Sequence, residues 1–249
     1  MDNDDRPVGR ILRRREVLAL FGGSSAAMLA ACAPTGSSGT ASTPAPTRAA
    51  TSTATSGQAV ALPSCIVRPA LTEGPYFVDE KLERSDIRES KPGTPLTLTF
   101  NVARVAGGGC TALALAQVDI WQCDALGVYS DATDPSFNTK GQHFLRGYQH
   151  TDVNGAARFT TIYPGWYGGR AVHIHFKIRV ANSDFTSQLF FDDALNAQVF
   201  ATAPYSQKGP GWLKNAQDGI YTGGGDKLLL KPVQSGGAYT ATFDIGLAS

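Results

Sequence analysis

Hydrophobic and polar residues alternate along several short stretches of the chain after residue 65. Alternation with a period of two is typical of a strand that buries one face. The stretches are Pro95–Val105, Ala114–Cys123, Asp152–Ile162, Val172–Val180, Ser187–Phe191 and Tyr239–Ile245. In the third stretch, Asn154-Gly155 predicts a hairpin turn. Because helical windows are few, the sequence predicts an all-β fold, an antiparallel β-sandwich with long loops.

The first 64 residues lack this alternation. Arg13–Arg15 precede the apolar run Val17–Phe21, and the order Arg-Arg-x-Val-Leu predicts an export signal of the twin-arginine type over residues 1–32. The apolar part ends in Leu-Ala-Ala and Cys32, as in a bacterial lipobox, so we expect a lipid anchor at Cys32 or a secreted protein. An amphipathic anchor helix is the alternative. Residues 33–64, rich in Ala, Thr, Ser and Pro, predict a flexible linker to a domain at 65–249.

Composition narrows the function classes. The chain has 249 residues and a formal net charge of +1, which argues against nucleic acid as a partner. No apolar run of about 18 residues follows the N-terminal segment, which excludes a polytopic membrane protein. Low charge (17%) and 27 glycines favour a β-rich, loop-rich domain over a helix bundle.

The clearest strand carries a pair of histidines, His173 and His175. Side chains at i and i+2 of a strand share a face, so both imidazoles point the same way and make half of a metal site. A surface histidine pair is the alternative interpretation. The turn Tyr163–Tyr167 lies just upstream, and it places Tyr167 and Arg170 at the mouth of this strand.

Several motifs occur together in a familiar order. They are Thr72-Glu-Gly-Pro-Tyr-Phe77, Val118-Asp-Ile-Trp-Gln122, Asp124-Ala-Leu-Gly-Val-Tyr129, Thr161-Ile-Tyr-Pro-Gly-Trp-Tyr167 and His173-Ile-His-Phe176. In this order the chain resembles the intradiol ring-cleavage dioxygenases, non-haem ferric enzymes, and is most similar to their exported, single-domain branch. The resemblance runs from about Cys65 to the C-terminus.

The resemblance implies one Fe(3+) held by Tyr129, Tyr167, His173 and His175. Phenolates are hard donors that suit a trivalent hard cation, and imidazole also suits iron. Tyr148 and Tyr163 are rival phenols. We expect Tyr163 to serve in packing, whereas Tyr148 stays open as a candidate.

The resemblance also implies the reaction, in which O2 opens a catechol ring between the two hydroxyl-bearing carbons to give a muconate-type diacid. Tyr167 would accept a substrate proton, Arg170 would stabilise charge on the substrate, and Gln188 would lie near the substrate and O2. Trp121 is expected to pack beneath the site, and Tyr76 to wall the pocket.

Two departures from well-known members of the family bear on the substrate. Only five residues separate Tyr167 from His173, and the helical N-terminal dimerisation region of catechol dioxygenases is missing. We therefore expect an open site that accepts varied catechols, and the oligomeric state stays open. Two other function classes remain at this point: a transthyretin-like binding module, and a copper or zinc site at the histidine pair.

The cysteines allow one structural prediction. Cys110 and Cys123 flank one strand, and about 13 extended residues would separate them by about 40 Å. A disulfide needs Cα atoms within about 7 Å, so an extended span disfavours this pair, and the pairing among Cys65, Cys110 and Cys123 stays open. Cys65 with Cys123 is the favoured pairing.

Overall fold

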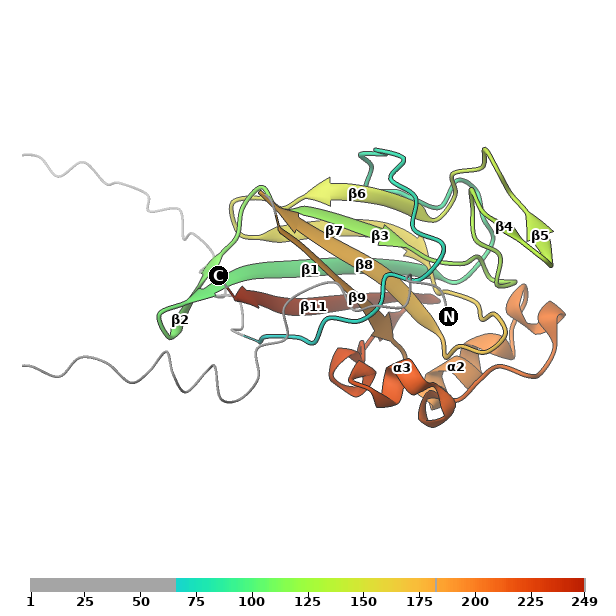
Figure 1. The fold of residues 1–249 in the computed structure, drawn as a ribbon. Helices are drawn as coiled ribbons and strands as arrows, with labels where there is room; N and C mark the ends of the chain where they lie inside the picture. Colours follow the sequence, from blue (N-terminus) through green and yellow to red (C-terminus); the bar gives the residue numbers. More distant parts are fainter. Residues whose placement is uncertain (1–65, 182, 249) are drawn as a thin grey trace, which may run out of the picture. The chain divides into compact units, whose positions relative to one another are not determined.

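The computed structural model describes residues 66–181 and 183–248, and its strands form two large sheets and one two-stranded sheet (Figure 1). The predicted export signal (1–32), the linker (33–64) and Cys65 lie outside the described residues. In the described part, no helix is long and apolar enough to cross a membrane.

The first sheet is built around the longest strand, β1 (Pro95–Ala106). β1 pairs in parallel with β11 (Ala238–Ala248), which places Phe100 beside Phe243. This parallel pair is an exception to the antiparallel arrangement that the sequence predicts. The other pairs in this sheet are antiparallel, and their strands are β2 (Gly109–Ala112), β7 (Ala156–Ile162) and β10 (Val233–Ser235).

The second sheet carries the histidine strand and is antiparallel throughout. Its order is β6 (Arg146–His150), β3 (Gln117–Trp121), β8 (His173–Val180) and β9 (Ser183–Phe190). The two sheets meet through aromatic residues, since the ring of Phe176 lies 5.3 Å from Phe100 and 5.6 Å from Phe243 between centroids. The predicted β-sandwich is therefore confirmed.

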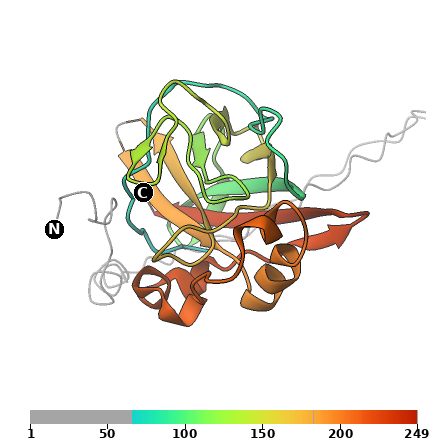
Figure 2. The same ribbon diagram turned by 90° about the vertical axis from the view of Figure 1, so that its right-hand side faces the viewer.

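The shorter elements gather around the ends of the sheets. β4 (Thr133–Asp134) and β5 (Phe137–Asn138) form a small hairpin. The chain after β9 forms α2 (Asp193–Phe200), α3 (Gly219–Thr222) and three short 3₁₀ turns, η2 (Tyr205–Lys208), η3 (Asn215–Gln217) and η4 (Gly225–Leu228). Figure 2 shows these helices side by side below the strands.

Two local predictions are wrong. Asn154-Gly155 does not close a hairpin, because β6 pairs with β3 in one sheet and β7 pairs with β1 in the other. The turn instead carries the chain between sheets, and the Asp152 carboxylate stabilises it by accepting hydrogen bonds from the N–H groups of Asn154 and Ala156.

The predicted Cys65–Cys123 disulfide is the second error. Cys123 is free and buried, in a cluster with Trp121 and Tyr129, and Cys110 is the described cysteine that is disulfide-bonded. Burial raises the pKa of the Cys123 thiol to about 12, so the thiol stays protonated and inert at neutral pH.

Candidate active site

The histidine pair lies on the face of β8 that points away from the sandwich core. Ile174 and Phe176 pack into the core, as strict alternation requires, and leave His173 and His175 on the opposite face. Both imidazoles are nevertheless buried, at 2% and 0% exposed, because loops and the segment around Gly74 cover them. Gly74 has a φ of +75°, and a Cβ there would press on the ring of His175, so this position favours glycine.

The indole ring of Trp121 packs against the imidazole of His175. Trp121 is the cross-strand neighbour of His175 on β3, and the two rings are stacked with centroids 5.0 Å apart and planes 8° apart. This is the packing position that the sequence suggests for Trp121.

Two tyrosines reach the histidine pair from loops. Tyr129 lies in the loop that follows β3, and Tyr167 lies in the loop between β7 and β8. The centroid of the Tyr167 ring is 5.6 Å from that of His173, and the Tyr129 centroid is 6.2 Å from that of His175. Since the two tyrosine rings are themselves 5.5 Å apart, the four predicted ligand side chains form one cluster.

The polar atoms of these side chains converge. The Nε2 atoms of His173 and His175 are 2.9 Å apart, and the Tyr167 hydroxyl is 3.5 Å from Nε2 of His173. Nδ1–H of His173 donates to the carbonyl of Ala171 at 2.6 Å, which leaves its Nε2 with a lone pair aimed at the site. The Tyr129 hydroxyl is buried with no hydrogen-bond partner. Two imidazole nitrogens and two phenol oxygens thus form a donor set that fits a hard trivalent metal.

Burial sets the protonation states of this donor set. It lowers the pKa of His173 to about 3, with help from the nearby charge of Arg170, and it holds the pKa of His175 well below its ordinary value. Both imidazoles are therefore neutral at neutral pH. Burial also raises the pKa of Tyr167 to about 12, against the opposing charge of Arg170, and raises that of Tyr129. A metal would have to displace a proton from each phenol.

Arg170 is held beside the site by a chain of polar contacts. Its Nε donates to Asp218 at 3.0 Å, and its NH2 group donates to the side-chain oxygen of Gln188 at 2.6 Å. Gln188 is the cross-strand neighbour of His175 on β9, and it donates to the carbonyl of Thr72 at 2.8 Å. The structure thus brings both predicted polar residues to the site.

Asp218 completes this network and was not anticipated from the sequence. It is buried, and it accepts hydrogen bonds from the N–H groups of Ala171 and Ile220, both at 2.8 Å. Burial raises the pKa of Asp218, but the charge of Arg170 and these hydrogen bonds outweigh it and leave the pKa below its ordinary value. Asp218 lies 48 residues from Arg170, so no local pattern could have paired them.

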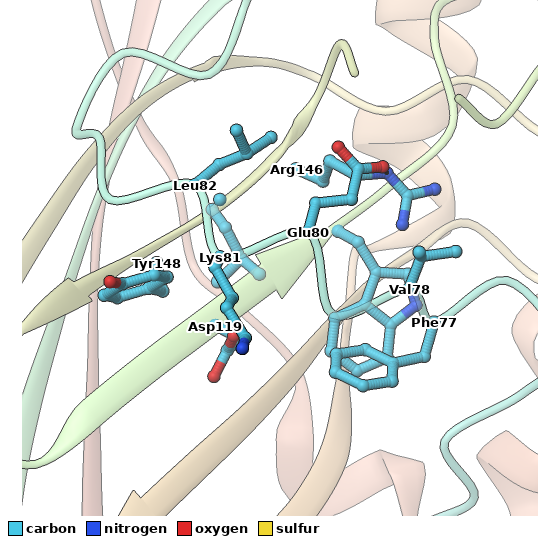
Figure 3. A pocket seen from close by; sticks show the side chains of 11 residues that line it. Phe77, Val78, Glu80, Lys81, Leu82, Asp119, Arg146 and Tyr148 are labelled. Atoms are coloured by element: carbon cyan, nitrogen blue, oxygen red, sulfur yellow. Dashed lines mark ion pairs between the residues drawn. The ribbon is translucent and has the colours of Figure 1, made fainter. Parts of the chain in front are cut away.

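The two rival phenols take other positions. Tyr163 is buried, and its hydroxyl donates to the side-chain oxygen of Asn196 at 2.7 Å. Tyr148 lies on β6 and lines a small hollow beside Trp121 (Figure 3). This hollow, of about 20 Å³, has room for about one water molecule.

Arg146 lies at the other end of that hollow, next to Glu80 (Figure 3). The buried guanidinium donates to the carbonyl of Tyr76 at 3.1 Å and to the hydroxyl of Ser130 at 2.7 Å. It therefore connects the segment of Tyr76 to the residue that follows Tyr129.

A cleft of about 540 Å³ leads to the tyrosines, a volume typical of small-molecule sites. Tyr76 lies in its wall, stacked on Tyr129 with centroids 4.4 Å apart, and its hydroxyl donates to Asp134 at 2.7 Å. The other lining residues are Leu126, Gly127, Val128, Ser136, Phe137, Tyr167, Gly168 and Lys208. Tyr167 lines the cleft, whereas Tyr129 and the histidines are buried and are not among its lining residues.

Comparisons with known proteins agree with this geometry. Residues 69–209 match the family described as Dioxygenase. An intradiol ring-cleavage dioxygenase from Tetranychus urticae is 32% identical, with a TM-score of 0.67, over 74% of this chain and 94% of that one. This chain belongs to the intradiol ring-cleavage dioxygenase family. It is an oxidoreductase that cleaves catechol-type rings, and a binding module or a copper or zinc enzyme is not favoured.

Two other dioxygenases of known structure share the fold. The dioxygenase domain of a carbohydrate-binding fusion protein from Streptomyces sp. SirexAA-E is 29% identical over 74% of this chain and 99% of that one, with a TM-score of 0.55. A 3-chlorocatechol 1,2-dioxygenase from Rhodococcus opacus 1CP is 23% identical over 71% of each chain, with a TM-score of 0.51. A comparison with curated proteins found no match.

Proposed function

We propose that this intradiol dioxygenase binds one ferric ion through Tyr129, Tyr167, His173 and His175. The observation that carries the proposal is the clustering of these four side chains, in which the donor atoms of His173, His175 and Tyr167 approach one another and the buried Tyr129 hydroxyl has no hydrogen-bond partner. A buried hydroxyl left unpaired is costly, and a metal ligand role explains why it is retained. The iron, when bound, supplies Lewis acidity and a template for the two catechol oxygens.

The protein side chains around that site have separate roles. Tyr167 lines the cleft, and its phenolate, formed once a metal has displaced the phenol proton, would accept one proton from an entering catechol hydroxyl. Arg170 holds a fixed positive charge beside the ring, where negative charge develops as the substrate loses protons. Gln188 keeps the guanidinium in place through its side-chain oxygen, and the aromatic wall of Tyr76 lies along the path of the substrate.

The proposed substrates are catechol and ring-substituted catechols, with O2 as the second substrate. The cleft has a volume of about 540 Å³, and Gly168 in its lining presents no side chain. The short loop between Tyr167 and His173 thus offers few side chains that could clash with a substituent on the catechol ring.

We also propose that the enzyme works outside the cytoplasm, tethered through Cys32. The Arg-Arg motif and the Leu-Ala-Ala-Cys32 sequence support this, and a random-coil linker of about 32 residues would span about 30 Å. A Cys32→Ser variant should move from the membrane fraction to the soluble fraction. Retention in the membrane fraction would contradict the anchor without affecting the site.

Metal analysis tests the central proposal. Protein produced with sufficient iron should contain about one iron per chain and show the visible absorption of tyrosinate bound to iron(III). His173→Ala should lose iron and colour together, whereas Tyr148→Phe, which changes a phenol outside the donor set, should keep both. A preparation in which zinc or copper predominates, or a coloured His173→Ala protein, would contradict the ligand assignment.

A further inference from the structure

The two tyrosine-bearing loops come from different sheets. Tyr129 follows β3 of the second sheet, and Tyr167 follows β7 of the first. Neither tyrosine lies on a strand, so the ladder hydrogen bonds of the sheets do not fix the distance between them. Contacts that join the two loops therefore contribute to that distance.

The inner ends of the loops are joined by neutral hydrogen bonds. The side-chain amide of Gln122 donates to the carbonyl of Ile162 at 2.9 Å and accepts from Thr161 at 3.0 Å. Further out, the N–H of Gly165 donates to the carbonyl of Asp124 at 3.2 Å. These bonds involve residues 122–124 and 161–165. They do not join the residues that directly precede the two tyrosines.

Lys208 supplies that contact. Its Nζ donates to the carbonyl of Leu126 at 2.6 Å and to the carbonyl of Trp166 at 2.5 Å. Leu126 precedes Tyr129 by three residues, and Trp166 immediately precedes Tyr167. The ammonium also lies over the indole ring of Trp166, 4.4 Å from its centroid. One charged group therefore bridges both loops, three residues before Tyr129 and one residue before Tyr167, with bonds stronger than those between neutral groups.

Two neighbouring features allow Lys208 to make both contacts, namely Gly127 and the 3₁₀ turn η2. The φ of Gly127 is +84°, and a Cβ there would collide with the Trp166 carbonyl and with Nζ of Lys208. Lys208 ends η2, and η2 is anchored by the buried Tyr205, whose hydroxyl donates to the carbonyl of Tyr163 at 2.7 Å and accepts from the N–H of Thr94 at 3.0 Å. The backbone of Lys208 is thus held in place by the hydrogen bonds of Tyr205, and its side chain extends from there to the two loops.

We propose that Lys208 is a positioning residue that fixes the separation of the two tyrosine loops and thereby sets how firmly Tyr129 and Tyr167 hold the metal. The metal part of this inference rests on the proposed function. The loop part does not, because it concerns contacts of the metal-free protein.

Lys208→Met removes the donors and the charge and keeps a side chain of similar length. Lys214→Met is the matched control, since Lys214 also lies over an indole, that of Trp212 at 3.4 Å, but contacts neither loop. In the metal-free proteins, hydrogen exchange of residues 122–129 and 163–170 should become at least about tenfold faster in Lys208→Met only. Lys208→Arg, which can donate to both carbonyls, should restore most of the protection.

The iron-loaded proteins give the second readout. Lys208→Met should release iron to a chelator at least about tenfold faster than wild type and shift the tyrosinate–iron absorption band, while Lys214→Met matches wild type. Unchanged exchange in both loops, or faster exchange in one loop alone, would overturn the bridge. Faster exchange in both loops with wild-type iron release and an unchanged band would overturn the metal part. A wild-type protein that binds no iron would instead refute the proposed function, and hydrogen exchange would still decide the role of Lys208 in the loops.

Discussion

The Tyr129 hydroxyl is the most informative single group in the site. It is buried and has no hydrogen-bond partner, which costs about 1–3 kcal/mol in the metal-free protein. Tyr163 offers a contrast, because its buried hydroxyl is paired with Asn196 at 2.7 Å. The two residues thus have the same side chain and similar burial. They differ in that the protein provides a hydrogen-bond partner for the Tyr163 hydroxyl and none for the Tyr129 hydroxyl.

This contrast predicts opposite effects of the same substitution. In the metal-free protein, Tyr129→Phe should leave the free energy of unfolding unchanged or raise it by about 1 kcal/mol, whereas Tyr163→Phe should lower it by about 1 kcal/mol. Tyr129→Phe should also lose bound iron, and Tyr163→Phe should keep it. Urea unfolding and iron analysis check both. A large destabilisation by Tyr129→Phe with iron retained would mean that Tyr129 is a packing residue.

Asp119, on β3 in the wall of the small hollow, predicts a pH dependence of stability (Figure 3). Burial raises its pKa from 3.8 to about 6, against the opposing charge of Arg179. A raised pKa in the folded state means that this group stabilises the fold below pH 3.8, and that the contribution is lost as the pH rises through about 6.

Asp119→Asn removes that loss, while Arg179 keeps its ion pair with Asp79 at 3.1 Å. The variant should therefore gain stability relative to wild type between pH 4 and pH 7.5, by about 1–2 kcal/mol. Unfolding of the metal-free proteins at both pH values measures this gain. A difference that does not change with pH, or that shrinks as the pH rises, would contradict the assignment.

At the residue scale, the sequence pattern succeeded where chemistry and spacing were local. The i, i+2 spacing of His173 and His175 fixes their common face without knowledge of the fold. Asp218 and Lys208 escaped prediction because their partners lie far away in the chain. These partners include backbone N–H groups for Asp218 and backbone carbonyls for Lys208, which no residue type reveals. The sequence predicted a disulfide for Cys123, whereas the thiol is free. The error arose because the burial of Cys123 depends on its packing with Trp121 and Tyr129, which the sequence does not show.

At the scale of elements, strands position the histidines and loops position everything else. The alternation of β8 was predictable because one face meets the core aromatics and the other meets the site. The hairpin at Asn154-Gly155 was not, since a tight turn encodes a reversal of direction but not the sheet in which the next strand pairs. The short strands β4 and β5 contain only two residues each, too few to show alternation.

The ion pair between Asp218, at the start of α3, and Arg170, in the loop before β8, predicts an effect on turnover without loss of metal. Asp218 begins α3 and holds Arg170, and Asn retains the capping function but lacks the charge that orients the guanidinium. Asp218→Asn should therefore lower kcat at least about tenfold while iron content and the visible band stay unchanged.

Asp192→Asn is the control for this variant. Asp192 caps α2 in the same way, by accepting hydrogen bonds from the N–H groups of Ala194 and Leu195, and it has no contact with Arg170. It should keep wild-type turnover. Equal kcat in the two variants, or iron loss in Asp218→Asn, would show that Asp218 does not act through Arg170.

For the molecule as a whole, the cleft predicts broad use of substituted catechols. It measures about 540 Å³, and each missing pocket contact is worth only about 1–3 kcal/mol of discrimination. We expect kcat/KM values for catechol, 4-methylcatechol, protocatechuate and hydroxyquinol within about a hundredfold of one another. A preference for one of them far beyond that factor would indicate a closed, selective pocket.

We propose that two loop phenols and a strand histidine pair hold iron for intradiol ring cleavage. Product analysis tests this most directly: the iron-loaded protein is supplied with catechol and ¹⁸O-labelled O2, and the product is identified by mass spectrometry. We predict cis,cis-muconate that carries both labelled oxygen atoms, formed only when iron is present. A yellow semialdehyde, from cleavage beside the hydroxyl-bearing carbons, or no oxygen-dependent product, would contradict the account.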